Sequence, residues 1–455
     1  MGIKKFNIEF QELTDYKFIR NDVRFFIGQK EKKLNDGIRL GKLFKTGRGK
    51  VINQEYVEEN QGVYPLYSSQ TQNEGVFGLI DTYDFDGEYL TWTTDGANAG
   101  RVFYRNGKFS CTNVCGTAKL INNHIFNLNL KFLPYLLNTI TKYYISIASG
   151  NPKLMNNVFE EIKIPKIPLQ KQNETIELIN PIENQILKIS NSILPPQDII
   201  DKVFAQHFGF DIENADKKKK ELVHYASLED LANEELKFDI SLKYRYIFFN
   251  YIKNTSNIEW IELGKLVDVK GGKRLPKGQN ITEEETNYKY IRVDDLSWSG
   301  VFDLENIKYI SEENHNAIKN YIAKENDILL TIVGATVGKC GLVPAELDGE
   351  NITENFARLI IKDKDNYLPE YVNYCLQSKT SVYQIDEFKG RGSQGKLALF
   401  RIKKIKMPKI GKTQQQEIVD EIKAELDKQE LLKQQITTER NKIDKIIEEC
   451  IMTAQ

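Results

Sequence analysis

The chain contains two copies of one sequence pattern. IKIPKIPLQKQNE at residues 162–174 agrees with IKMPKIGKTQQQE at residues 405–417 at seven of thirteen positions. IRLGKL at residue 38 returns as IELGKL at residue 261, and GANAGR at residue 96 returns as GATVGK at residue 334. The offset between copies grows from 223 to 238 and then to 243 residues. Matches that stay in order over this length predict one structural unit copied twice, with insertions in the second copy.

Each copy has the same internal order of elements. A Leu-Gly-Lys-Leu segment opens it, and runs rich in aromatic and β-branched residues follow, such as GEYLTWTTDG and NDILLTIVGATVG. These runs, bounded by Gly and Asp, predict strands. FLPYLLNTITKYY and YLPEYVNYCLQ predict a short helix in each copy, before the copy closes on IPKI or MPKI. A mixed α+β domain is therefore expected twice.

A long helical segment follows each domain. The first has isoleucines at 179, 182, 186, 189 and 193, which is the spacing of a coiled-coil seam. The second has Ile422, Gln429, Ile436, Ile443 and Cys450 at intervals of seven, with Leu432 and Ile446 between them. Two such helices, each after a copied domain, are expected to pair with one another. Pro181 is expected to kink or split the first helix.

Composition excludes several classes of protein. No apolar run approaches the length of a membrane span, and five cysteines in 455 residues do not form a disulfide framework, so a cytoplasmic protein is expected. The net charge is −1, but the segment between Phe388 and Ile410 holds eight basic residues and no acid. Five more basic residues lie between Ile38 and Lys50, again without an acid. Local basic clusters of this kind suit a nucleic-acid partner or a solvated face.

Catalytic motifs are not found. GATVGK lacks the Gly and the Ser or Thr of a phosphate-binding loop, because Val333 and Cys340 occupy those positions. Cys111 and Cys115 have no second Cys or His pair, and the four histidines are scattered, so no zinc site is predicted. The glycines are expected to form tight turns that bring a basic side chain close to a partner. Paired recognition fits the sequence better than catalysis.

Candidate DNA contacts are polar side chains in the loops of both copies. Basic residues suit phosphates, and hydroxyl or amide groups suit base edges. In the first copy the candidates are Arg48, Lys50, Ser68, Ser69, Gln70, Thr94, Asn98 and Arg101. In the second copy they are Lys270, Lys273, Arg274, Arg292, Asp294, Thr336, Lys339, Arg391, Ser393, Gln394 and Lys396.

Nearly the whole chain resembles the specificity subunit of a bacterial type I restriction-modification system. The second half carries the resemblance through YKYIRVDDL, DILLTIVGATVGKCGLV, ENFARLIIK and GSQGKLAL. The first half is similar through YPLYSSQTQNEGVFGLID and FDGEYLTWTTDGANAGRVFYRNGKFSCTNVCG. No single motif is diagnostic, but their order, found twice, is specific.

The resemblance implies a non-catalytic subunit with two target recognition domains, joined by two long antiparallel coiled-coil helices that act as a ruler. Each domain would read half of a bipartite site in double-stranded DNA. Two methyltransferase subunits would dock, and restriction or translocase subunits could join. The chain itself would hold no cofactor or metal: S-adenosylmethionine would lie in the methyltransferase, and ATP and magnesium in the restriction subunit. Two alternatives are a type IIB-like restriction-methylation enzyme and a coiled-coil adaptor that binds only proteins.

Six segments are expected along the chain. They are an N-terminal segment (1–37), target recognition domain 1 (38–168), a first spacer helix region (169–209), a charged connector (210–257), target recognition domain 2 (258–410) and a C-terminal spacer helix (411–455).

Overall fold

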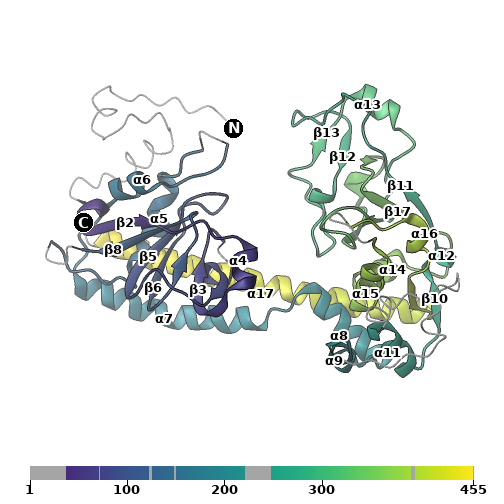
Figure 1. The fold of residues 1–455 in the computed structure, drawn as a ribbon, viewed down its shortest axis with the longest axis horizontal. Coiled ribbons are helices and arrows are strands. Elements are labelled where there is room, and N and C mark those ends of the chain that lie inside the picture. The colour runs from purple at the N-terminus through teal and green to yellow at the C-terminus, as the bar shows by residue number, and fades with distance from the viewer. Residues whose placement is uncertain are drawn as a thin grey trace. The chain divides into compact units, whose positions relative to one another are not determined.

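The computed structural model describes residues 37–70, 72–121, 125–147, 150–220, 247–390 and 395–453. The chain forms two compact units, which are described separately (Figure 1). The first comprises residues 1–192 with 433–455, and the second comprises residues 193–432. The C-terminal helix α17 (Lys412–Thr453) contributes residues to both units. The expected N-terminal segment lies almost entirely outside the described residues.

The first unit contains three small sheets with helices packed on them. Its four-stranded antiparallel sheet has the order β2-β8-β5-β6, its three-stranded sheet the order β4-β3-β7, and β1 pairs with β9. The strands are β1 (Ile38–Arg39), β2 (Phe44–Arg48), β3 (Gln61–Tyr67), β4 (Val76–Ile80), β5 (Glu88–Thr93), β6 (Val102–Asn106), β7 (Ser110–Cys111), β8 (Cys115–Leu120) and β9 (Lys163–Ile164). The helices are α3 (Leu40–Leu43), α4 (Gln54–Glu59), α5 (Leu133–Ile140), α6 (Asn156–Glu161) and α7 (Leu169–Ser192).

The second unit repeats this topology. Its sheets have the orders β11-β17-β14-β15 and β13-β12-β16, and β10 pairs with β18. The strands are β10 (Trp260–Glu262), β11 (Val267–Gly271), β12 (Lys289–Ile291), β13 (Lys308–Tyr309), β14 (Ile328–Thr331), β15 (Cys340–Leu342), β16 (Asn351–Ile352), β17 (Phe356–Ile361) and β18 (Lys406–Pro408). The helices are α8 (Pro196–Phe208), α9 (Ile212–Lys220), α11 (Ile247–Thr255), α12 (Leu263–Leu266), α13 (Glu312–Ala317), α14 (Pro369–Gln377), α15 (Lys379–Phe388) and α16 (Leu399–Ile402). The expected duplication and mixed α/β class are confirmed, and the two predicted short helices are α5 and α14.

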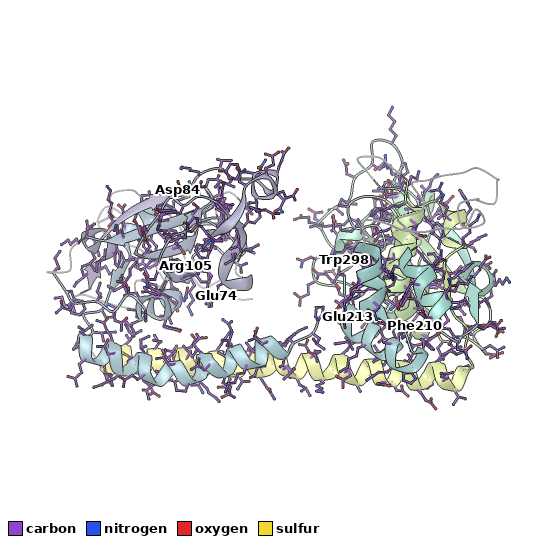
Figure 2. All side chains as sticks on the ribbon, turned by 60° about the horizontal axis from the view of Figure 1, so that its bottom comes forward. Glu74, Asp84, Arg105, Phe210, Glu213 and Trp298 are labelled. Atoms are coloured by element: carbon purple, nitrogen blue, oxygen red, sulfur yellow. The ribbon has the colours of Figure 1, made fainter. Side chains whose placement is uncertain are left out.

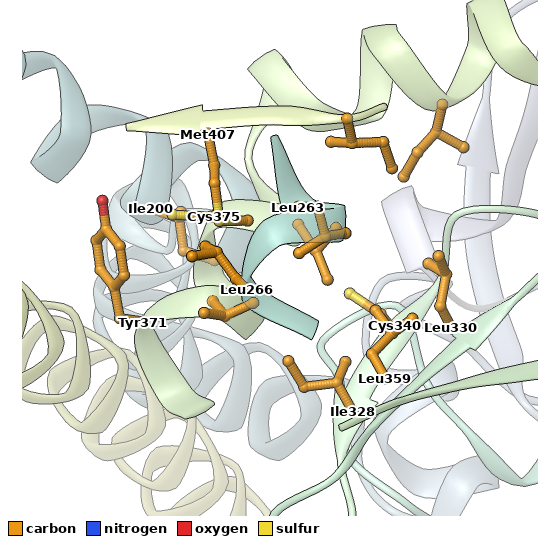
Figure 3. Packing of buried hydrophobic residues seen from close by; sticks show 14 of the residues in the cluster. Ile200, Leu263, Leu266, Ile328, Leu330, Cys340, Leu359, Tyr371, Cys375 and Met407 are labelled. Carbon is orange, nitrogen blue, oxygen red and sulfur yellow. The ribbon is translucent and has the colours of Figure 1, made fainter. Parts of the chain in front are cut away.

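The copied Leu-Gly-Lys-Leu segment has the same role in both units. Leu40 N donates to the Ile162 carbonyl at 2.9 Å, and Leu263 N donates to the Ile405 carbonyl at 2.7 Å. The leucines of this segment are buried in each core. Figure 3 shows Leu263 and Leu266 packed among residues of the sheet and of α14. The segment therefore fastens the start of each domain to its closing strand.

The helices after each domain differ from the sequence prediction at two points, Pro181 and Ile193. Pro181 lies inside α7 and does not end it; the helix ends at Ser192, before Pro195 and Pro196 start α8. In the first unit α7 runs antiparallel to the end of α17 (Figure 1), with Thr175 Oγ1 3.2 Å from Cys450 Sγ. Seam residues Ile179 and Ile186 are buried with Ile443. Ile193, predicted to lie in the seam, is outside the helix.

The charged connector has a packed beginning and end. Helix α9 lies at the beginning of the connector, and Ala215 on it is fully buried in the second core. Asp216 accepts a hydrogen bond from Tyr383 Oη at 2.9 Å and lies 3.4 Å from Lys379 Nζ. Phe248 of α11 is buried in the same core. Residues 221–246 lie outside the described part of the chain.

Candidate nucleic-acid interface

A glycine turn lies between two strands in each unit. Gly100 N donates to the Thr93 carbonyl at 2.8 Å, and Gly338 N donates to the Thr331 carbonyl at 3.0 Å. The first glycine of each turn has a positive φ, +94° at Gly96 and +101° at Gly334. A Cβ at either of these two would meet nothing within 4 Å. The copied motif therefore makes the same left-handed turn twice, with open space beside the backbone for a partner.

In each unit a second turn carries a lysine at a point where two segments of the chain cross closely. Lys50 N donates to the Cys111 carbonyl and Lys273 N to the Ile352 carbonyl, both at 3.0 Å. A Cβ on the preceding glycine, Gly49 or Gly272, would lie 2.0 Å from a backbone oxygen. No side chain fits in that space, so glycine is required there. Both lysines are exposed.

In the first unit two basic side chains converge on Asp95, which is next to the glycine turn. Arg48 Nη2 lies 3.2 Å from Asp95 Oδ2 and donates to Thr94 Oγ1 at 3.0 Å. Lys153 Nζ lies 3.5 Å from Asp95 Oδ1. Thr94 is fully buried, so its hydroxyl supports Arg48 and does not face a ligand. This arrangement leaves an excess of positive charge at the turn.

Lys153 was missing from the predicted contacts, although its counterpart Lys396 was included. Each forms an isolated β-bridge beside the glycine turn, Lys153 with Asp95 and Lys396 with Val333. The repeat of Lys-Leu at residues 153 and 396 was the signal that pairs them. Lys396 is exposed and Lys153 is also open to solvent.

The serines and amides of the first unit lie in surface turns. Ser68 Oγ is 2.8 Å from Thr112 Oγ1, and Ser69 is half-buried. Gln70 is exposed and its amide donates to the Val76 carbonyl. Asn98 is exposed in the glycine turn. These four side chains remain candidates for base edges.

Arg101 has its charged neighbours on the long helices. Partial desolvation and the positive charge of Arg440 on α17 lower the pKa of Arg101, while the negative charges of Glu183 on α7 and Asp444 on α17 oppose that shift. The Arg101 side chain is exposed beside the glycine turn, within the electrostatic range of these helix charges. Its expected contact with DNA stays a prediction.

Two predicted contacts of the second unit have structural partners instead. Lys339 is only 7% exposed, and its Nζ donates to the Val293 carbonyl at 2.7 Å. Burial lowers the pKa of this lysine. Arg292 Nη2 lies 2.7 Å from Oδ1 of the buried Asp295. The structure thus uses both cations to hold the 293–295 turn, and their expected contacts with DNA stay predictions.

The other candidates of the second unit are more open. Lys270 and Lys273 are exposed, Asp294 is exposed, and Thr336 is half-buried in the glycine turn. Arg274 is exposed and paired with Glu354. The predicted contacts outside the described residues are Arg391, Ser393 and Gln394.

Trp298 is an exposed aromatic side chain that the predicted contacts did not include (Figure 2). It is 61% exposed at the tip of a turn closed by a hydrogen bond from Ser297 N to the Val301 carbonyl at 2.9 Å. Gly300 gives the turn its positive φ of +80°. A Trp between two serines before a glycine was the available signal. An indole held in this way can stack on a base or fill a partner's pocket.

The described residues contain neither a cluster of metal ligands nor a membrane-spanning helix. No group of three or more His, Cys, Asp or Glu side chains there could hold a metal ion. Among the described helices, none has the length and apolar character to cross a membrane.

Comparison with known proteins gives the family. The model of the type I restriction modification DNA specificity domain matches residues 32–194 and again residues 255–439, more than half of the chain. The chain therefore belongs to this family and contains its domain twice, as the sequence resemblance predicted.

Individual relatives agree with that family. The type I restriction enzyme MpnII specificity subunit of Mycoplasma pneumoniae is 41% identical over 132 residues, 29% of this chain and 39% of its own length. Another M. pneumoniae protein named as a type I specificity subunit is 43% identical over 135 residues, 30% of this chain and 44% of its own length. The chain spans about half the length of the curated relatives it matches. A solved S subunit from M. genitalium aligns over 91% of this chain and 97% of its own at 15% identity, with a TM-score of 0.36.

Proposed function

We propose that this chain is the specificity subunit of a type I restriction-modification complex, and that each unit reads one half of a bipartite DNA site. One observation carries the proposal. The same pair of glycine turns, each beside an exposed lysine, is built twice by equivalent hydrogen bonds, in a chain that the family model matches twice. A duplicated reading surface is what a target with two halves requires.

The exposed side chains suit the two kinds of contact that DNA offers. Lysines beside the turns, such as Lys50, Lys153, Lys273 and Lys396, suit phosphates and would supply affinity. Ser69, Gln70 and Asn98 in the first unit have hydroxyl or amide groups for base edges. The residues in equivalent positions differ between the units, for example Asn98 and Thr336. The two units would accordingly read different bases.

Catalysis would belong to partner subunits. We propose two methyltransferase subunits that bring S-adenosylmethionine, and restriction or translocase subunits that bring ATP and magnesium. This chain would supply sequence recognition and a scaffold in the cytoplasm, which agrees with its five free, buried cysteines. The names of its relatives favour type I partners over a type IIB-like enzyme.

Methylome mapping tests the proposal directly. The chain would be expressed with its methyltransferase subunit in a host without other methylation, and modified bases would be located by sequencing. We expect one motif of two short specific halves separated by a spacer of fixed length. The purified chain alone should bind duplexes that carry this motif with a salt-dependent affinity and should transfer no methyl groups. A protein-only adaptor would give no motif and no salt-dependent DNA binding. Methyl transfer by the chain alone would contradict the assignment of catalysis to partner subunits.

A further inference from the structure

Arg105 is a buried cation that the recognition surface described above does not use. It lies on β6 and is 5% exposed. Its Cζ is 3.6 Å from the ring centroid of Tyr67 and 4.6 Å from that of Phe103. Its Nε donates to Thr91 Oγ1 at 3.2 Å. Arginine is rarely buried without a partner, and here aromatic rings flank its charge.

A second nitrogen of this guanidinium, Nη2, reaches a strained turn. Arg105 Nη2 donates to the carbonyl of Glu74, and Figure 2 labels both residues in the first unit. Glu74 has a φ of +52° and Gly75 has a φ of +82°, so two successive residues are left-handed. A glutamate in that region is strained and keeps the conformation only where its surroundings hold it. The hydrogen bond from Arg105 Nη2 to the Glu74 carbonyl stabilises this conformation.

This turn is joined to candidate base-reading side chains. Ser68 N donates to the Gly75 carbonyl at 3.0 Å. A Cβ on Gly75 would lie 3.0 Å from the Gln70 carbonyl oxygen and 3.3 Å from Arg105 Nη2. The backbone around Gly75 is therefore packed between Gln70 and Arg105. A shift of Glu74 and Gly75 would move Ser68 and Gln70 with them.

The second unit has no arginine in the equivalent position. At the offset of the glycine turns, Arg105 corresponds to Val343, a buried residue of an apolar core cluster. The two copies share a scaffold, but the second unit has no guanidinium at this position. Its part-buried Arg358, on β17, donates instead to Asp327 and to the Ile322 carbonyl. The difference associates Arg105 with the loop that is particular to the first unit.

We propose that Arg105 is a positioning residue that fixes the turn bearing Ser68, Ser69 and Gln70 in the conformation that reads the first half of the DNA site. The inference rests on the proposed function, and it names a determinant of specificity that touches no base. Lysine would keep the charge but not the planar fork that stacks and donates in several directions at once. Methionine would keep much of the volume and remove every donor.

The test uses Arg105→Lys and Arg105→Met in the complete chain with its methyltransferase partner. Discrimination at the first half-site should fall about tenfold in Arg105→Lys, the value of one base contact, and further in Arg105→Met. The second half-site is an internal control and should be unchanged. Lys119→Met removes an exposed charge over the Tyr89 ring of the same unit and should leave both half-sites unchanged. Hydrogen exchange of the backbone amides of residues 74–76 in the free protein should be faster in both Arg105 variants.

The outcomes separate the possible failures. Unchanged motifs and unchanged exchange in both Arg105 variants would overturn the positioning role. An equal loss at both half-sites with a lower melting temperature would also overturn it, because Arg105 would then support only the fold. Should Arg105→Met fail to fold, Arg105→Lys and its exchange rates decide the matter. Absence of any bipartite motif in the unaltered protein would instead refute the proposed function, while the exchange comparison would still test the hold on Glu74.

Discussion

Lys396 is the exposed basic residue with the clearest place beside a glycine turn, where it bridges to Val333. Lys396→Glu should lower the affinity for a specific duplex by about tenfold and reduce the slope of log affinity against log salt by about one. The reason is loss of one phosphate contact and repulsion of the phosphate by the new carboxylate. Fluorescence anisotropy at several salt concentrations measures both quantities.

The control for this variant is Lys253→Glu, which reverses an exposed charge on α11 of the same unit. It should change the slope far less. Equal effects of the two variants would mean that overall charge, and not the turn, determines binding.

Two neighbouring glycines should respond differently to the same substitution. A Cβ at Gly272 would lie 2.0 Å from the Thr353 carbonyl oxygen, whereas at Gly271 the nearest atom is Leu399 Cδ1 at 3.6 Å. Gly272→Ala should therefore lower the free energy of unfolding by about 3 kcal/mol or more, and Gly271→Ala by less than about 1 kcal/mol. Chemical denaturation monitored by circular dichroism checks the difference. Similar values for both would show that the crossing at Gly272 can widen.

The sequence identified turn residues better than it identified the direction of side chains. Repeated glycines and lysines can be aligned between copies, so the two turns could be predicted. Lys339 looks like a contact residue in GATVGK, but its ammonium is buried on the Val293 carbonyl. That carbonyl is available only after the 293–295 turn has folded beside it. The role of Arg105 could not be predicted for the same reason, because the Tyr67 ring and the Glu74 carbonyl that it contacts come from other parts of the chain.

Among the elements, α8 and α15 share a buried carboxylate. Asp201 on α8 is 4% exposed, and its Oδ1 accepts a hydrogen bond from Lys379 N, at the start of α15, at 2.8 Å. Its Oδ2 has no hydrogen-bond partner among the described residues. Burial raises the pKa of Asp201 to about 7 from its ordinary value of 3.8; the amide and charge of Lys379 lower it, and Asp198 and Asp216 raise it.

This shift predicts how stability depends on pH. Below pH 3.8 both states hold the proton; between pH 3.8 and about 7 the unfolded state loses it and the folded state keeps it. The free energy of unfolding should therefore fall across this window and level off above it. Asp201→Asn keeps the acceptor for Lys379 and removes the charge, so it should stabilise the second unit by roughly 2–4 kcal/mol at pH 8 and by little at pH 4.

Melting temperatures measured between pH 4 and pH 8 test this prediction. Asp365→Asn in the same unit is the control, because Asp365 is exposed and does not contribute to the pKa shift of Asp201. A flat difference between Asp201→Asn and the unaltered chain across this range would contradict the assigned protonation.

The heptad spacing of apolar residues predicted that the two long helices exist, but it did not predict where they end. The isoleucine spacing continues to Ile193, yet α7 stops at Ser192 because Pro195 and Pro196 follow closely. Pro181 is exposed within α7, and the helix continues on both sides of it. Loss of one backbone hydrogen bond at Pro181 is offset by packing of Ile179 and Ile186 in the seam. The sequence marks all three prolines, but it does not show that α7 tolerates Pro181 and ends before Pro195 and Pro196.

For the whole molecule, α17 provides a test of the expected ruler, since its 42 residues contribute to both units. Seven residues inserted after Leu432, with seven more after Ser192, should lengthen the separation by roughly 10 Å at about 1.5 Å per residue. Seven residues make nearly two full helical turns, so the insertion rotates the apolar seam about the helix axis by only about 20°. The spacer of the methylated motif should then grow by roughly three base pairs, at about 3.4 Å each, while both half-sites stay the same.

Methylome sequencing of the insertion variant supplies the measurement. Inserting the seven residues only after Ser192 is the matched control and should leave the spacer length as it is. Changed half-sites with the original spacer would show that the helices do not determine spacing.

At this scale the sequence predicted the duplication and the family, because repeated motifs keep their order whatever their surroundings. The sequence did not predict that α9 and α11, at the ends of the charged connector, pack into the second core through Ala215 and Phe248. The connector is mostly polar, and α9 and α11 each have only a short apolar face. Such a face cannot be recognised in the sequence without the core against which it packs.

The pairing of β1 with β9, and of β10 with β18, has an evolutionary consequence. In each unit the opening strand lies directly beside the closing strand, with Ile38 opposite Ile164 and Ile261 opposite Met407. The whole recognition segment is thus a loop closed at its base by one short ribbon. Recombination at just two junctions could replace that segment with a different one while the helices keep their seams. Such an exchange could give the chain a new target sequence while the helices, and the subunits expected to bind them, stay the same.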